Sequence, residues 1–428
     1  MSLISTPNLQ RARGELDDRW ILAEQMLAIF CTFVVAARPK LGGGLVAGDP
    51  LAWVLIPLWV PVLRRYRGAS SLVGLLLIAC CSSWMLTRFA SADHHVSMKL
   101  NAEIIRLLLS TATSVGLLLW VREHLDQKYV YLVFGLGMVA AGPSNRALFA
   151  TNQWKFFWSV PLTVVIVGWL ASELRPRLTL ALLGVFGALC MLNDARSNFA
   201  VLLLTMVLVV WRLLPRVHSR RSTVAGTLAM MGAIAASAYY GVQAAILDGV
   251  LGESTRARTA EQLQASGSLL MGARPEFGAS TGLLQLRPGG FGGGTFLTTN
   301  DLVAAKDGMK LLNFDPNNGY VEKFMFGRGI ELHSMVFDLW AWAGPVGVLV
   351  ALVILAQTLF LLGHQLITEP AAGAVLIFVS LLTLWNLPFS PWLASMPITI
   401  LTLGVGLVRR QTRRLPGAAP STPRRSAD

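Results

Sequence analysis

The sequence predicts an all-α polytopic protein that crosses a membrane about twelve times. Its composition is the first observation that supports this fold class. Of the 428 residues, 54% are hydrophobic and only 14% are charged, whereas a soluble chain carries about a quarter charged residues. The mean hydropathy is +0.57. This composition excludes a soluble enzyme, a disordered protein and a nucleic-acid-binding domain.

Twelve windows are apolar enough to form helices that cross a bilayer, since such a helix needs about 20 mainly apolar residues. An even number of spans places both ends of the chain on one side. The first window follows a mixed-charge segment that lacks a small-residue cleavage site, so we expect it to be retained rather than removed as a signal peptide. The windows are 20–37, 48–63, 69–87, 104–121, 129–144, 155–172, 178–193, 198–214, 224–246, 335–362, 371–388 and 391–408.

The basic residues predict the orientation, because short cytoplasmic loops are enriched in lysine and arginine. If both termini are cytoplasmic, the segments on that side hold 20 basic residues, and the short loops opposite hold 7. The sequence therefore predicts cytoplasmic termini. This distribution explains most of the net charge of +13 without a nucleic acid or another polyanionic partner. Residues 409–428 are expected to form a basic tail that contacts membrane lipids.

The predicted organisation has four parts. These are a transmembrane bundle with spans one to nine at 1–246, a large external loop at 247–334, spans ten to twelve at 335–408, and the cytoplasmic tail at 409–428. The loop is nearly neutral, with eight basic and nine acidic residues, and its stretches 256–265 and 299–312 predict short helices. Long loops without structure are uncommon unless they are functional. We therefore expect chemistry in this loop and at the outer rim of the bundle.

Three short external loops each place an arginine near the membrane rim: Arg88, Arg146 and Arg196. In one interpretation these side chains extend to lipid headgroups or pair locally, for example Arg196 with Asp194. In the other they share an anionic ligand. We favour the second for the set of three, because this side of the membrane is otherwise poor in basic residues and guanidinium groups suit phosphate oxygens.

His333 lies where the long loop re-enters the membrane. Ser334 is a candidate N-cap for the tenth span, which places His333 at a helix N-terminus. The helix dipole there favours the neutral imidazole that a general base requires, although a lone histidine is more often structural. Asp338, an acid within a span, is a further candidate. So is Trp340, which suits either sugar stacking or an interfacial tryptophan belt.

Around His333 the chain reads Gly327-Arg-Gly329-Ile-Glu-Leu-His333-Ser334, and Gly344-Pro-Val-Gly347 follows after nine residues. This resembles the bacterial O-antigen ligase superfamily, in which a histidine followed by asparagine, serine or glutamine precedes Gly-x-x-Gly by nine residues. The superfamily also includes O-antigen polymerases and protein O-oligosaccharyltransferases. The spans, the cytoplasmic termini and the large loop before the histidine are also similar to the ligase. Gly344-Pro345 has a simpler interpretation as a helix kink.

The resemblance implies a GT-C-like glycosyltransferase of the bacterial inner membrane, with its active site facing the periplasm. Such an enzyme moves O-antigen polysaccharide from undecaprenyl diphosphate to lipid A–core oligosaccharide. By position, His333 corresponds to the essential histidine of the family, and Arg196 resembles an essential arginine. A further essential arginine of the loop corresponds to Arg274 or Arg287. We prefer Arg274, because Arg287 borders a glycine run that we expect to be flexible.

The residues also predict a chemistry. No external segment contains an Asp-x-Asp pair, so we expect no metal site and no cofactor. Arginines then stabilise the departing diphosphate, a role that we assign to Arg88, Arg146, Arg196 and Arg274. His333 deprotonates the acceptor hydroxyl, which implies inversion at the anomeric carbon. The nearest alternatives are the polymerase and the protein O-oligosaccharyltransferase, which differ in acceptor; a lipid-linked glycan transporter is more remote.

Overall fold

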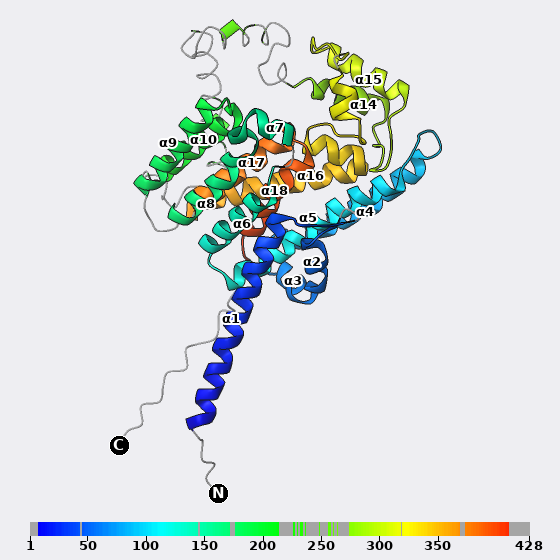
Figure 1. Ribbon diagram of the computed structural model, residues 1–428. Helices are drawn as coiled ribbons and strands as arrows, with labels where there is room; N and C mark the ends of the chain where they lie inside the picture. The colour runs from blue at the N-terminus through cyan, green and yellow to red at the C-terminus, as the bar shows by residue number, and fades with distance from the viewer. Residues whose placement is uncertain are drawn as a thin grey trace.

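The computed structural model shows a helical bundle with a smaller helical layer at one end (Figure 1). It describes residues 7–42, 45–143, 146–171, 176–213, 274–317, 319–368 and 373–410, together with single positions between 214 and 273. For residues 7–18 only the backbone is described. Most residues of the predicted short helix at 256–265 and of the predicted span at 224–246 fall outside the described residues.

The elements of the first half precede the large loop. They are α1 (Pro7–Ala37), β1 (Lys40–Gly42) and β2 (Leu45–Val46), which form a small antiparallel hairpin, α2 (Gly48–Val54), α3 (Ile56–Leu63), α4 (Ala69–Ala90), α5 (Met98–His124), α6 (Gln127–Ala141), α7 (Arg146–Thr151), the π-helix η1 (Trp154–Trp158), α8 (Ser159–Ala171), α9 (Pro176–Leu192) and α10 (Arg196–Leu213). The second half contains α14 (Glu276–Leu286), α15 (Thr299–Lys310), the π-helix η3 (Val321–Met325), α16 (Met335–Thr368), α17 (Gly373–Phe389) and α18 (Trp392–Gly406).

Five described helices are long and apolar enough to cross a membrane. They are α4, α5, α10, the part of α1 from Arg19 to Ala37 and the part of α16 from Met335 to Ile367. Shorter apolar helices at 154–170, 176–192, 373–389 and 392–406 accompany them. The structure therefore agrees with an all-α, multi-pass membrane protein. The number of twelve spans stays a prediction.

The window 48–63 does not form the single helix that we expected. It is divided into α2 and α3 at Leu55, whose φ and ψ are −89° and 11°. Pro57 lies at the start of α3, and Pro61 lies within that helix. Each proline lacks the backbone N–H that continues a helix, so an apolar composition alone was not enough to predict one straight span.

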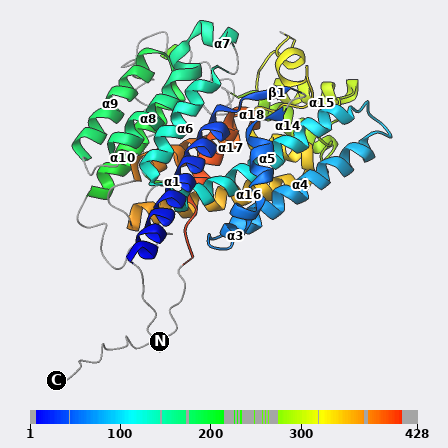
Figure 2. The same cartoon turned by 60° about the horizontal axis from the view of Figure 1, so that its bottom comes forward.

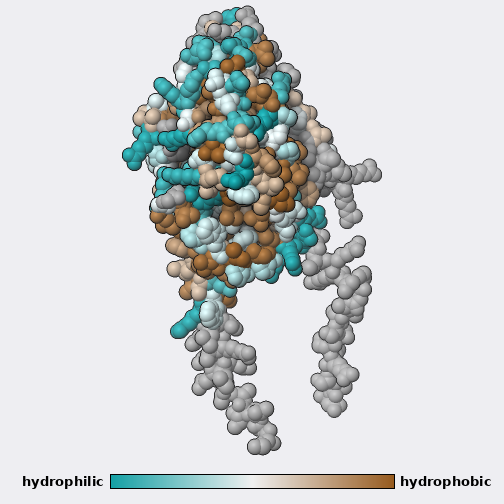
Figure 3. Space-filling view, turned by 90° about the vertical axis from the view of Figure 1, so that its right-hand side faces the viewer, coloured by the Kyte–Doolittle hydropathy of each residue, from teal (hydrophilic) through white to brown (hydrophobic). Residues whose placement is uncertain are grey.

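The helices form two flanks around a central pair. Helices α6, α8, α9 and α10 lie side by side on one flank, whereas α4 and α5 lie on the other (Figures 1 and 2). Helices α17 and α18 pack between them. Figure 3 shows broad hydrophobic areas over the body of the molecule and hydrophilic residues gathered towards its upper end. This division suits a bundle whose sides face lipid and whose end faces water.

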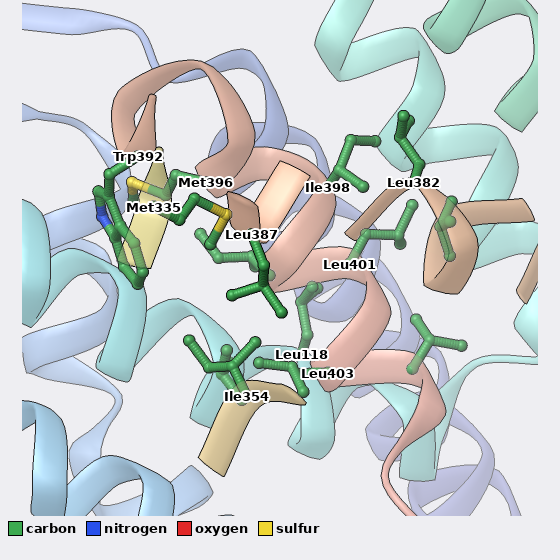
Figure 4. Packing of buried hydrophobic residues seen from close by; sticks show 14 of the residues in the cluster. Leu118, Met335, Ile354, Leu382, Leu387, Trp392, Met396, Ile398, Leu401 and Leu403 are labelled. Atoms are coloured by element: carbon green, nitrogen blue, oxygen red, sulfur yellow. The ribbon is translucent and has the colours of Figure 1, made fainter. Parts of the chain in front are cut away.

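The interior is filled by close contact between apolar side chains of different helices. Figure 4 shows Trp392 and Met396 of α18 beside Met335 of α16, and Leu403 of α18 near Ile354 of α16. All five are almost completely buried. Lipid tails are as apolar as these side chains, so van der Waals packing rather than exclusion from water stabilises helix association inside a membrane.

Segments that we predicted to be cytoplasmic meet at one end of the bundle. The backbone N–H of Arg67 donates to the carbonyl of Val408 at 2.9 Å, and Arg122 donates to the carbonyl of Leu407 at 2.6 Å. The 22 residues of α4 separate this group from the loop that we predicted to be external, where Val96 pairs with Thr295. The structure thus places the two predicted sides at opposite ends of one helix.

The glycine run after Arg287 is packed rather than flexible, so that expectation was wrong. Residues 290–295 are buried. The N–H of Gly292 donates to the carbonyl of Ala341 in α16 at 2.9 Å, and the N–H of Gly294 donates to the hydroxyl of Thr87 in α4 at 3.1 Å. The glycines are needed because they let the loop backbone approach both helices. The other loop prediction, a short helix at 299–312, is confirmed as α15.

Helix α16 is broken at Gly344, where φ is 60° and ψ is −144°. A Cβ atom at Gly344 would lie 2.3 Å from the carbonyl oxygen of Gly289, and one at Gly347 would lie 1.8 Å from that of Leu339. The kink predicted from Gly344-Pro345 is therefore confirmed. Both glycines of the Gly-x-x-Gly motif are required by backbone packing.

We expect Gly292→Ala to destabilise the docked loop, since φ is +92° there and a Cβ atom would lie 2.3 Å from the backbone nitrogen of Thr87. The cost is about 1–3 kcal/mol, measured as a lower thermal midpoint of the purified protein. Gly289→Ala is the control, because its Cβ meets nothing within 4 Å. Equal midpoints for the two variants would contradict the packed loop.

Candidate active site

His333 occupies a strained position between the external loop and α16. Its φ of 54° lies in the left-handed region, which non-glycine residues rarely adopt. Its Nδ1 atom is buried and has no hydrogen-bond partner among the described residues. A buried polar atom without a partner costs about 1–3 kcal/mol. Backbone strain and an unpaired polar atom at one residue are typical of functional sites.

Ser334 begins α16, as we predicted. Its hydroxyl accepts a hydrogen bond from the N–H of Phe337 at 3.4 Å and donates one to the carbonyl of Leu387 at 3.1 Å. The first bond caps the helix, and the second ties that cap to the end of α17. His333 therefore lies directly before a capped helix N-terminus, as we predicted.

Tyr320 connects His333 to Glu276 of α14. The tyrosine and histidine rings lie 6.0 Å apart at an angle of 36°. The tyrosine hydroxyl donates to Oε1 of Glu276 at 2.6 Å. Burial raises the pKa of Tyr320, and the Glu276 carboxylate raises it further. Tyr320 therefore stays protonated at neutral pH and keeps this hydrogen bond, which fixes the ring that contacts His333.

A surface hollow of about 510 Å³ lies beside this group. Tyr320 is one of its walls, so the hollow adjoins the residue that contacts the imidazole. It is lined by Pro275, Phe314, Gly319, Tyr320, Lys323 and Phe324. These residues come from the start of α14 and from the segment that precedes α16. Sequence reasoning missed this aromatic group, because its members are brought together by tertiary packing and form no recognised motif.

Arg274 belongs to the same region. Its guanidinium lies over the ring of Phe389 at 5.7 Å from the ring centroid, and its positive charge acts against the rise in the pKa of Tyr320. The loop arginine that we preferred is therefore close to the His333 group. The reason that we gave for preferring it, a flexible glycine run, does not hold.

Arg287 is part of a different polar cluster. Its guanidinium donates to both carboxylate oxygens of Asp93, at 3.0 and 3.2 Å. His94 bonds Asp93 at 2.6 Å through Nδ1 and Asp301 at 2.9 Å through Nε2. Hydrogen bonds from His94 and Arg287 lower the pKa of Asp93. The cluster ties the turn after α4 to the start of α15.

The ring of His94 is enclosed within this cluster. Its side chain is only 6% exposed. The signal that could have revealed it is the capping box of α15, in which Thr298 and Asp301 bond each other. That box fixes a carboxylate at the position where His94 can reach it.

Asp338 and Trp340 have structural roles. Asp338 is fully buried; its Oδ1 accepts from the N–H of Leu332 at 2.7 Å, and its Oδ2 accepts from the N–H of Trp392 at 2.8 Å. The indole N–H of Trp340 donates to the carbonyl of Pro288 at 2.9 Å. These bonds tie the loop before His333, at Pro288 and Leu332, to α16 and α18. Both residues therefore position the site.

The three rim arginines are exposed at the ends of their helices. Arg88 lies in the last turn of α4, Arg146 begins α7 and Arg196 begins α10. The Nε of Arg196 donates to Asp194 at 2.9 Å, and Lys155 lies 3.7 Å from the same carboxylate. This is the local pair that our first interpretation anticipated.

The structure thus brings together His333 and Arg274 and places the other arginines in separate groups. Figure 1 shows α7, α9 and α10 on one side of the upper end, and α14 and α15 on the other. The meeting of the rim arginines with His333 around one ligand stays a prediction. Within the described ranges, no group of three or more histidine, cysteine, aspartate or glutamate side chains forms a metal site.

The fold therefore defines a helical, multi-pass membrane protein that carries a polar site at one end. No protein-family model matches the chain, and no curated protein matches its sequence.

We expect Asp338→Asn to loosen the loop around His333. The amide would present N–H groups to one of the two backbone donors, at a cost of about 1–3 kcal/mol for the buried N–H that loses its acceptor. The thermal midpoint should fall, and proteolysis of the external loop should become faster. Asp307→Asn is the control, because its exposed ion pair with Lys310 contributes little. A midpoint equal to that of the control would show that Asp338 does not hold the loop.

Proposed function

We propose that the chain is an inverting, metal-independent glycosyltransferase of the O-antigen ligase superfamily. It moves O-antigen polysaccharide from undecaprenyl diphosphate to lipid A–core oligosaccharide in lipopolysaccharide biosynthesis. The protein lies in the bacterial inner membrane with its active site facing the periplasm and both termini in the cytoplasm. The motif around His333 and the distribution of basic residues support this proposal.

The observation that carries the proposal is the state of His333. The residue combines a left-handed backbone, a buried Nδ1 without a partner and a place before a capped helix N-terminus. Its ring neighbour Tyr320 lines an open hollow. A purely structural histidine gains hydrogen bonds from its surroundings. The backbone of His333 is held in place, while its Nδ1 has no hydrogen-bond partner among the described residues. Such an imidazole is suited to forming a hydrogen bond with a substrate.

In the proposed reaction, His333 removes the proton of an acceptor hydroxyl as the oxygen attacks the anomeric carbon of the donor. The bond to undecaprenyl diphosphate breaks on the opposite face of the sugar, so the configuration inverts. General base catalysis of this kind contributes about 10²–10⁴-fold. The charge that develops on the departing diphosphate needs stabilisation.

The arginines of the upper end are suited to that second task. Arg88, Arg146 and Arg196 are exposed at helix ends, where a lipid-linked diphosphate carries its charge. Guanidinium groups bind phosphate oxygens through two parallel hydrogen bonds. Arg274 lies closer to His333 and is assigned to the same leaving group. Because arginines supply the positive charge, the proposed reaction uses no divalent ion and no cofactor.

The acceptor separates the members of the superfamily. An O-antigen polymerase and a protein O-oligosaccharyltransferase share the donor and the histidine with the ligase. A lipid-linked glycan transporter needs no general base. Transfer from purified undecaprenyl-diphosphate glycan, with core lipid, glycan and pilin-like protein offered in turn, tests the assignment directly.

We expect His333→Ala to abolish transfer in that assay, run with EDTA, while donor-lipid binding and the thermal midpoint stay close to wild type. His364→Ala is the matched control, because His364 lies near the other end of α16. This variant should transfer glycan at the wild-type rate. Near-normal transfer by His333→Ala would refute the role of His333 as general base. Strict dependence of wild-type transfer on a divalent ion would refute the metal-independent reaction.

Arg196→Lys should lower transfer by roughly tenfold or more, because an ammonium group does not reproduce a bidentate guanidinium–phosphate contact. Asp194→Asn separates the two interpretations of Arg196, since it removes the local partner and leaves the guanidinium. The measurement is the initial rate of transfer. If Arg196 only pairs with Asp194, both variants will behave alike; if it binds the diphosphate, Asp194→Asn will keep near-normal activity.

A further inference from the structure

The aromatic hollow beside His333 has a role that the proposed chemistry does not yet use. We propose that it binds one sugar ring of the acceptor oligosaccharide, a ring that carries a phosphate or carboxylate group, and so holds a neighbouring hydroxyl at His333. This inference rests on the proposed function. It assigns the acceptor subsite to the segment between α15 and α16.

Aromatic rings follow one another from the hollow to the imidazole. The centroids of Phe314 and Tyr320 lie 6.3 Å apart, those of Tyr320 and Phe324 lie 5.7 Å apart, and those of Tyr320 and His333 lie 6.0 Å apart. Tyr320 is thus the centre of the group, and Glu276 fixes it by a hydrogen bond. A ligand that contacts this row lies next to the proposed base.

The ring faces and the charge of the hollow suit a sugar. The face of an aromatic ring carries partial negative charge, and the C–H groups on one face of a pyranose carry partial positive charge. Phe324 is 56% exposed, which leaves its ring available for such a contact. Lys323 is also exposed and supplies a positive charge for an anionic substituent of the same sugar.

The local backbone keeps these side chains on one side. Val321–Met325 forms the π-helix η3, and Val321 and Met325 are buried, while Lys323 and Phe324 between them are exposed. Single π-helical turns occur frequently at functional sites. The buried residues anchor the turn, so the exposed pair is presented from a fixed base rather than from a free loop.

Acceptor kinetics test the subsite with the full-length protein in nanodiscs. Phe324→Ala should raise KM for lipid A–core oligosaccharide by about three- to tenfold, the range for loss of one aromatic contact, with kcat and the donor KM unchanged. Phe324→Tyr should restore the wild-type KM. Phe30→Ala is the control, because Phe30 is 55% exposed in α1, away from the hollow. If Phe324→Leu also had the wild-type KM, the contact would be a simple apolar contact with lipid, and the proposed subsite would be refuted.

Lys323→Gln tests the anionic substituent. It should raise the acceptor KM, and core oligosaccharide treated with hydrofluoric acid to remove phosphate identifies the group. If phosphate is recognised, the treated acceptor binds wild type more weakly and Lys323→Gln has no further effect on it. If a carboxylate is recognised, the treated acceptor binds wild type normally and still loses affinity in Lys323→Gln. An unchanged KM for both acceptors would refute the anionic contact.

Direct binding separates this inference from the proposed function. The probe is core oligosaccharide without its lipid, titrated into the inactive His333→Ala protein with and without Phe324→Ala. Transfer by wild type, with equal binding by the two proteins, would refute the subsite and leave the function standing. No transfer by wild type, with weaker binding in the double variant, would refute the function and leave a saccharide site.

Discussion

The carboxylate of Asp338 is the contact on which the geometry of the external site depends. It accepts one backbone hydrogen bond from Leu332, just before His333, and another from Trp392 at the start of α18. A buried backbone N–H without a partner is costly, and more so at membrane depth, where water cannot replace the lost bond. One side chain therefore satisfies two chain segments that regular helix geometry leaves unpaired. The left-handed conformation of His333 persists because its neighbours on both sides are held.

Five of the predicted spans correspond to described helices that are long and apolar enough to cross a membrane, because burial in lipid requires continuous apolar stretches. The exceptions have local causes. Prolines divide the window 48–63 into α2 and α3. The glycine run suggested flexibility, yet the same lack of side chains lets Gly292 and Gly294 contact the backbone of two helices. The composition of a segment limits the conformations that it can adopt in isolation. Packing against other helices determines which of those conformations the folded protein has.

The candidate site was predictable only where it is local in sequence. The cap by Ser334 and the kink at Gly344 follow from neighbouring residues, so sequence reasoning anticipated both. The bond between Tyr320 and Glu276 joins residues 44 positions apart, and that between His94 and Asp301 joins residues 207 positions apart. Such pairs depend on how α14 and α15 dock against the bundle. A single sequence carries no periodicity or spacing that reports this docking.

The arrangement also indicates how two large substrates could reach one base in the proposed reaction. The donor is a lipid, and the exposed rim arginines lie at the ends of helices that border lipid. The hollow beside Tyr320 is lined by Lys323 and Phe324, which are both exposed. In the proposed reaction, donor and acceptor would then contact different parts of this end of the bundle. Inversion requires in addition that the attacking oxygen and the leaving diphosphate lie on opposite faces of the sugar. In that reaction, the bonds that hold Leu332 and Ser334 on either side of His333 would keep the base in one position while both substrates bind.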